Sequence, residues 1–315
     1  MARPDTHTPY SRTGLRQSRT ILRPGHDAAV RQETLKFARE AMEKAGFDFG
    51  RFDQLQRQNQ ADMREALAKL RAASDERAPA MWDTVARSTE LWLKSKKVGD
   101  TLSFSPDVFA LSTADTISVA PGFEFLSENI GPWANSAQVA LHRTRDDDDD
   151  GFDGLVTFRF SFENQTGAGN LFRVSALLGV TASCVVTADG YVFWPWVPES
   201  RMQVWADLGI TEIVDGGQVI IPPLQAGQFQ LIADVDVTGD FGGVGTIAGQ
   251  DLFRTFILEY DGLYVPANGK VEFDVSCEVF WARLYGGGCD FVATGSGRQV
   301  TAPGVFVSPQ PWIIT

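Results

Sequence analysis

A run of aspartates is the most conspicuous group of potential ligands in this sequence of 315 residues. Asp146, Asp148 and Asp150 alternate and are followed by Gly151, like the opening of a calcium loop, where alternate carboxylates and a sharp turn surround a hard cation. The twelfth position of such a loop is Thr157, whereas an EF-hand requires a glutamate there. We therefore expect either a calcium site at Asp146, Asp148 and Asp150 that is not an EF-hand, or a solvated loop joining two strands.

A second candidate site is the aromatic segment YVFWPWVP, which follows the turn pair Asp189-Gly190. Proline rarely lies within a central strand, so this segment is predicted to contain a sheet edge or a loop. Trp194 and Trp196 would there be able to stack on a sugar or enter an interface. The alternative is that both are packed in the core, because tryptophan is usually well buried.

Groups for acid-base or nucleophilic catalysis are sparse. The sequence has three histidines, and His142 is the one that lies after residue 100, close to Asp146. We find no nucleophile elbow, phosphate-binding glycine loop, zinc-protease helix or Cys/His cluster. A pair of carboxylates could still catalyse the cleavage of a sugar, but acidic residues are too common in this sequence for a particular pair to be identified. We therefore expect a protein that is not an enzyme, and an enclosed polar cleft gathering His142 with several acids would contradict this.

The cysteines predict a reducing compartment. Cys184 lies among valines and is expected to behave as a small apolar residue, and Cys277 and Cys289 are expected not to meet even if a hairpin joins them. The N-terminus lacks the apolar core of a signal peptide, and no apolar run approaches the roughly 20 residues of a membrane helix. These features predict a cytoplasmic protein with reduced thiols and no membrane span.

Charge is distributed unevenly along the chain. Residues 1–100 contain 19 Lys and Arg against 14 Asp and Glu, a net charge of +5, and the remainder carries −17. Residues 1–26 are predicted to be a disordered basic tail, which either binds nucleic acid or an acidic surface, docks on a neighbouring copy, or is merely solvated. The acidic second half is not expected to bind nucleic acid. The arginines of the tail are Arg3, Arg12, Arg16, Arg19 and Arg23.

Residues 27–99 have a helical pattern. A first amphipathic helix is predicted to follow Asp27 and end at Gly46, a second to cover 52–74, and a third to begin near Pro79 and close with the lysines around 96. The apolar stripe is narrow, like the seam of a coiled coil, so we expect a coiled-coil-like hairpin. The apolar stripes of these helices require a partner. The partner is another of these helices, the β region or another chain, and self-association through the helices is one expectation. The stripe comprises Phe52, Leu55, Asn59, Met63, Leu67, Leu70 and Ser74, then Trp82, Val85, Thr89 and Trp92.

After about residue 100 the apolar residues recur at every second position, and turn pairs such as Asn268-Gly269 recur as well. The clearest strand follows that pair, with apolar side chains alternating from Val271 to Trp281. Because no helical pattern separates the strands, residues 100–315 are predicted to form an antiparallel β-sandwich of jelly-roll type, and the chain as a whole a segregated α+β protein. The other predicted strands lie around 156–162, 229–237, 136–142, 171–187, 190–194, 217–221, 252–261, 289–294 and 299–307.

Three segments, IGPWANSAQV, GGVGTIAGQDLFR and LYVPANGKVEFDVS, resemble parts of uncharacterised bacterial proteins. Those proteins have a helical N-terminal segment and a β-rich C-terminal domain. The resemblance implies the same arrangement here, and it implies no activity and no site residue.

The leading functional hypothesis is a structural or binding protein, in which an acidic sandwich recognises a protein partner and the helices tether or oligomerise it. One alternative is a coat-like subunit that assembles into particles, because an arginine-bearing arm precedes the sandwich. Another is a carbohydrate-binding or carbohydrate-active jelly roll that uses Trp194 or Trp196. No cofactor is expected apart from calcium at the aspartate run.

Overall fold

The computed structural model describes residues 36–37, 39–95, 108–120, 122–144, 151–190, 197–214, 217–221, 225–240, 245–284, 286–295 and 297–310. The predicted domain boundaries at 26/27 and 99/100 lie outside these residues, as do the basic tail and residues 191–194 of the strand predicted at 190–194.

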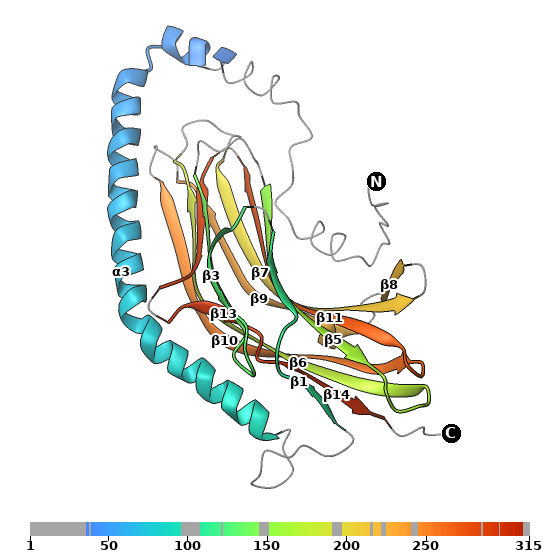
Figure 1. Ribbon diagram of the computed structural model, residues 1–315. Coiled ribbons are helices and arrows are strands. Elements are labelled where there is room, and N and C mark those ends of the chain that lie inside the picture. The colour runs from blue at the N-terminus through green and yellow to red at the C-terminus, as the bar shows by residue number, and fades with distance from the viewer. Residues whose placement is uncertain are drawn as a thin grey trace.

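One long helix precedes a series of strands (Figure 1). The helix is α3 (Phe49–Ser95). The strands are β1 (Phe109–Leu111), β2 (Thr116–Val119), β3 (Glu124–Asn129), β4 (Ser136–Arg143), β5 (Gly151–Glu163), β6 (Asn170–Ala188), β7 (Glu199–Val214), β8 (Gly217–Ile221), β9 (Phe229–Thr238), β10 (Thr246–Val265), β11 (Lys270–Leu284), β12 (Gly288–Ala293), β13 (Gln299–Thr301) and β14 (Val305–Pro309), with a 3-10 turn, η1 (Ala226–Gln228), before β9.

The strands form two antiparallel sheets. The eight-stranded sheet has the order β1-β14-β6-β12-β4-β13, with β10 beside β6 and β3 beside β4. The six-stranded sheet has the order β2-β5-β11-β7-β8, with β9 beside β7. One continuous cluster of buried side chains from both sheets forms the core. The predicted antiparallel sandwich is confirmed, and its finer assignment to the jelly-roll type remains a prediction.

Alternation along β11 explains how the six-stranded sheet faces the core. The apolar positions predicted from Val271 to Trp281 are all at most 1% exposed. On β5, Val156, Phe158 and Phe160 are fully buried in the same way. Since successive side chains of a strand point to opposite faces, these residues fix which face is inside.

The strand β6 is buried on both faces, which the sequence shows as a nearly continuous apolar run. Phe172, Val174 and Leu178 belong to the shared core. Leu177, Thr181 and Val185 have the opposite parity, so they lie on the outer face of the eight-stranded sheet, yet they are at most 4% exposed. They are covered because α3 lies across β6 and β10 (Figure 1).

The start of α3 is set by local chemistry. The Asp48 carboxylate accepts a hydrogen bond from the backbone N–H of Arg51 at 3.0 Å, which caps the first turn. The rings of Phe47, Phe49 and Phe52 pack together beside this cap, with centroids 4.7 to 6.5 Å apart. The preceding helical residues end at Gly46, which has a positive φ of 88°, as predicted for the end of the first helix.

The predicted break at Pro79 is wrong, and the hairpin of helices is not seen. Helix α3 continues through Pro79 for 47 residues in all, although proline removes one backbone hydrogen bond. The helix changes direction part-way along (Figure 1), as an internal proline commonly causes. The helix does not end at Pro79 because the residues on both sides of it are held against the sheet. Ser74 and Ala78 before Pro79, and Val85 after it, are nearly fully buried.

Part of the seam of α3 therefore packs on the sheet of its own chain rather than on a second helix. Leu55 and Leu70, which also belong to the predicted stripe, are 44% and 41% exposed. Trp92 packs edge-on against Phe306, with ring centroids 4.9 Å apart, beside Leu177. Near the other end, Met63 lies against Gly245. Within the described part of the chain, no helix is both long enough and apolar enough to cross a bilayer.

The three cysteines are buried and free, as predicted. The strands of Cys277 and Cys289 do not form the hairpin that the sequence left open, because β11 belongs to the six-stranded sheet and β12 to the eight-stranded sheet. The connection between them crosses from one sheet to the other. Burial raises the pKa of Cys277 to about 12, which makes this thiol unreactive at neutral pH.

Candidate functional site

A cavity of about 630 Å³ lies between the N-terminal half of α3 and the outer face of the eight-stranded sheet. This volume is typical of sites for small ligands. Helix α3 forms one wall, and β4, β6 and β12 form the floor. Among the lining residues are Met63, Leu67 and Arg71 from the helix, and His142, Val185 and Asp290 from the sheet.

The register of three strands brings the floor residues together. Asp290 on β12 is directly opposite His142 on β4 and opposite Val185 on β6. Directly opposite residues of neighbouring strands share a face, so all three side chains are on the side that α3 covers. The helix residues Met63, Leu67 and Arg71 are four apart and so share one face of α3.

An ion-pair network joins the helix to this floor. The Nδ1 atom of His142 lies 2.6 Å from an Asp290 carboxylate oxygen, and the guanidinium of Arg71 bonds the other oxygen of the same carboxylate. Asp290 is 15% exposed and both of its partners are 45% exposed. Because His142 uses Nδ1 for Asp290, its other ring nitrogen is the one available to a ligand.

These contacts shift both pKa values. The hydrogen bond to Asp290 raises the pKa of His142 above 6.5, against the opposing effect of burial. Burial by itself would raise the pKa of Asp290, but the hydrogen bond with His142 and the charge of Arg71 outweigh it, so that this pKa is lowered. At neutral pH the network therefore contains a carboxylate held between two donors.

A glycine turn closes one end of the cavity. Gly287 has a φ of 138°, and a Cβ atom there would lie 2.2 Å from the Thr187 carbonyl oxygen. A Cβ on the neighbouring Gly288 would lie 2.5 Å from the Arg143 carbonyl oxygen. Side chains are therefore excluded from this turn, and the chain can pass close to the ends of β4 and β6 while it crosses between the sheets.

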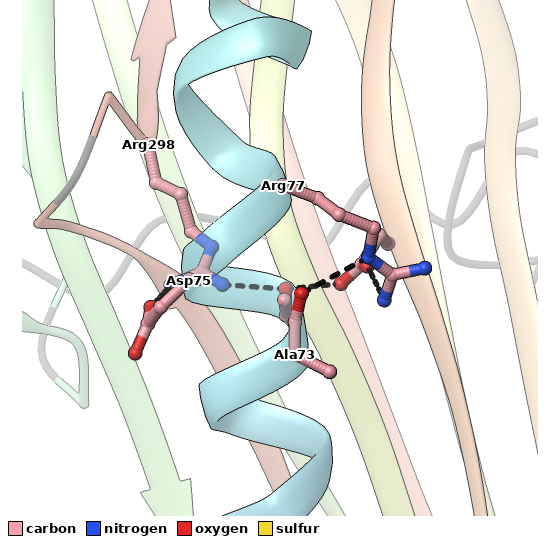
Figure 2. Close-up of polar contacts among 6 residues, drawn as sticks. Ala73, Asp75, Arg77 and Arg298 are labelled. Carbon is pink, nitrogen blue, oxygen red and sulfur yellow. Dashed lines mark hydrogen bonds and ion pairs between the residues drawn. The ribbon is translucent and has the colours of Figure 1, made fainter.

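A second polar cluster holds α3 beside the cavity (Figure 2). Asp251 on β10 accepts hydrogen bonds from the hydroxyl of Ser74 and, at 2.6 Å, from Arg77. From the other side, Arg298 reaches the helix and bonds Ser74 and Asp75. The Arg298 side chain is 5% exposed, so its charge is satisfied by these partners rather than by bulk water. The cluster fixes the helix at the turn that follows Arg71.

The sites predicted from the sequence are not the residues of this cavity. Asp146, Asp148 and Asp150 lie outside the described residues, and so do Trp194 and Trp196. The calcium site and the sugar platform therefore remain predictions. Among the residues that the structure describes, no three His, Cys, Asp or Glu side chains are grouped closely enough to hold a metal ion.

The cavity does bring His142 together with acidic side chains, those of Asp290 and Asp189. Arg64 and Arg71 line the same cavity from α3, so its lining carries both signs of charge. His142 was visible in the sequence as the histidine of the β half. Its partners carried no local signal, since Asp290 lies 148 residues away along the chain and Arg71 lies 219 residues from Asp290.

Comparison with known proteins assigns no family. No family model matches the chain, and no curated protein matches it. A solved carbohydrate-binding module, TmCBM61 in complex with β-1,4-galactotriose, is 9% identical, with a TM-score of 0.20 over 63% of this chain and 92% of the module.

Two other carbohydrate-binding modules give similar values. The mannan-recognising TmCBM27 is 13% identical, with a TM-score of 0.20 over 60% of this chain and 90% of that one. A family 11 module from Clostridium thermocellum, in complex with a β-1,3-1,4-mixed-linked tetrasaccharide, is 15% identical, with a TM-score of 0.12 over 59% and 93%. TM-scores this low carry no argument about family or function.

Proposed function

We propose that this chain is a non-enzymatic binding protein in which a β-sandwich of jelly-roll type supplies the recognition site and α3 forms one wall of it. The observation that carries the proposal is the cavity of about 630 Å³ between α3 and the outer face of the eight-stranded sheet. A helix that simply covered the sheet would be expected to pack closely against it, as α3 does around Val85. At Met63, Leu67 and Arg71 the helix instead lines a space.

The walls of this space are held in place before any ligand arrives. Arg71 and His142 are tied to Asp290 across the helix and two strands. Arg298, Ser74 and the neighbouring Asp251 fix the following turn of α3. Preformed walls favour binding because less conformational entropy is lost when the ligand enters.

The test is a ligand screen with a variant that fills the cavity. Ala68→Trp places a large ring in the cavity, because Ala68 lines it from α3. Ala61→Trp is the matched control, since Ala61 is exposed on the same helix and is not part of the lining. The screen measures the melting temperature with neutral sugars, sugar acids, carboxylates and phosphates. We expect a class of compound that stabilises the native chain and Ala61→Trp but not Ala68→Trp, and equal responses of both variants would contradict the proposal.

A second candidate function, a subunit that assembles into particles, is favoured by the edge strand β8. Val219 and Ile220 on this strand are 50% and 73% exposed. An exposed apolar edge strand is a common site of strand-to-strand association. Electron microscopy of the concentrated native chain and of Ile220→Lys tests this function, which predicts particles that the substitution abolishes.

A further inference from the structure

The charged side chains of the cavity are concentrated on its helix wall. Arg64 and Arg71 line it from α3, and His142 lines it from β4. Of the two aspartates in the lining, Asp290 is already paired with both Arg71 and His142. Arg64 therefore adds a positive charge at the helix wall, and a positive charge at the wall of a concave site attracts an anion.

Arg64 is the cation that is free to meet such an anion. It lies on α3, seven residues before Arg71 and four before Ala68, so the three face the same side of the helix. Arg71 is paired with Asp290. The guanidinium of Arg64 is exposed and, within the described part of the chain, joins no ion pair. An arginine in this position can form two parallel hydrogen bonds with a carboxylate or a phosphate.

The remainder of the lining is apolar. Met63 and Leu67 line the cavity from the helix, and Val185 lines it from the sheet at 4% exposure. A fully hydrated inorganic ion would gain nothing from these side chains. A ligand with an apolar body would remove them from water, at about 25 cal/mol for each Å² of apolar surface.

We propose that the cavity binds a small amphiphilic acid, whose carboxylate or phosphate pairs with Arg64 and whose apolar body lies on Met63, Leu67 and Val185. This inference rests on the proposed binding function and specifies its ligand class. His142 contributes a further donor through the ring nitrogen that Asp290 does not use.

The experiment is calorimetric titration of the full chain with compounds that share one tail and differ in the head group. Octanoate and octyl phosphate distinguish the two acid groups, and octyl glucoside is the neutral control, each below its micelle concentration. We expect at least one acid to bind about tenfold or more tightly than octyl glucoside, because the charged head group is paired.

Arg64→Gln removes the pairing cation, and Arg57→Gln is the matched control, since Arg57 is exposed on the same helix but lies outside the cavity lining. We expect Arg64→Gln to weaken the acid about tenfold and to leave octyl glucoside unchanged, with Arg57→Gln behaving like the native chain. Equal affinities for acid and glucoside, or an Arg64→Gln variant that binds the acid normally, would overturn the proposed ligand class.

The two proposals fail in different ways. If Ala68→Trp abolishes the binding of octyl glucoside and of the acids to the same extent, the cavity is a binding site and the preference for an acid is wrong. If none of the compounds binds, the inference about amphiphilic acids is overturned, and the proposed binding function is then judged by the broader screen with Ala68→Trp.

Discussion

Arg298 carries one of the few charges in the described part of the chain that are almost entirely removed from water. Its side chain is 5% exposed and bonds Ser74 and Asp75 on α3. Replacement by Gln keeps much of the volume but removes the charge and most of the donors, so that Asp75 loses its partner. We expect Arg298→Gln to lower the free energy of unfolding by about 2 kcal/mol, measured by urea denaturation.

The matched control is Arg254→Gln on β10, because Arg254 is exposed. A surface substitution of this kind is expected to change stability by less than about 0.5 kcal/mol. Equal effects of the two substitutions would mean that the contacts of Arg298 with α3 contribute nothing to stability.

His142 gives the molecule a stability contribution that depends on pH. The pKa of His142 is raised above 6.5, chiefly by the hydrogen bond to Asp290, while Glu124 adds a smaller raising effect and Arg71 opposes it. A group whose pKa is raised by folding stabilises the native state below its unfolded pKa, and this contribution is lost as the pH rises through the folded pKa. We therefore expect the stability difference between the native chain and His142→Gln to be largest below pH 6.5 and to shrink at higher pH.

Asp290 acts in the opposite direction at the acidic end. Its pKa is lowered from 3.8, so its contribution is present above that value and is lost as the pH falls through the folded pKa. Urea denaturation across this range measures both contributions. A stability difference for His142→Gln that stays constant from acid to alkaline pH, or that persists in an Asp290→Asn background, would contradict the assigned network.

Single residues of the candidate site were only partly predictable. The sequence set His142 apart by its rarity, but a histidine alone does not specify its neighbours. Asp290 was one acid among 40 acidic residues, and Arg71 one of 28 basic ones. Their proximity depends on the pairing of β12 with β4 and on where α3 crosses the sheet, which are long-range properties of the fold.

At the scale of elements, the contact between α3 and β6 depends on a position without a side chain. A Cβ atom at Gly179 would lie 2.5 Å from the Thr301 hydroxyl and 3.1 Å from a methyl group of Val85. We expect Gly179→Ala to push the helix away from the sheet and to lower the free energy of unfolding by about 1 to 3 kcal/mol. Protease cleavage within α3 should become faster as well.

Gly131→Ala is the matched control, since a Cβ at Gly131 would meet nothing within 4 Å. Its expected effect on unfolding and on cleavage is small. If the protease cleaves Gly179→Ala at the native rate, and this variant keeps the native free energy of unfolding, the helix does not lie as closely on β6 as described.

The elements were predicted best where one face is apolar and the other polar. The pattern from Val271 to Trp281 specified β11, whereas β7 was missed although Met202, Val204 and Leu208 alternate and are fully buried. Asp207 and Gly209 lie between the apolar positions, and aspartate and glycine are depleted in strands, which weakens the strand signal. The break predicted at Pro79 was wrong because tertiary contacts on both sides outweigh the local cost of the proline.

At the scale of the whole molecule, the uneven charge of the sequence corresponds to ion pairs between α3 and the β region. Arg71 and Arg77 on α3 pair with Asp290 and Asp251 on the acidic β region. The narrow seam predicted that the helix has a partner but did not say which one. In the structure, the stretch from Met63 to Trp92 packs on the sheet of the same chain. Neither pairing nor register could be read from the helix sequence, because a stripe of this width also suits a second helix.

The docking of α3 on its own sheet is tested most directly by amide hydrogen exchange of the full chain, followed by mass spectrometry over a range of protein concentrations. The account predicts that the amides of 63–92 are protected together with those of β6, and that this protection is the same at every concentration. Exchange of 63–92 at the rate of an isolated helix, or protection that appears only as the concentration rises, would show that the stripe contacts another chain or nothing at all.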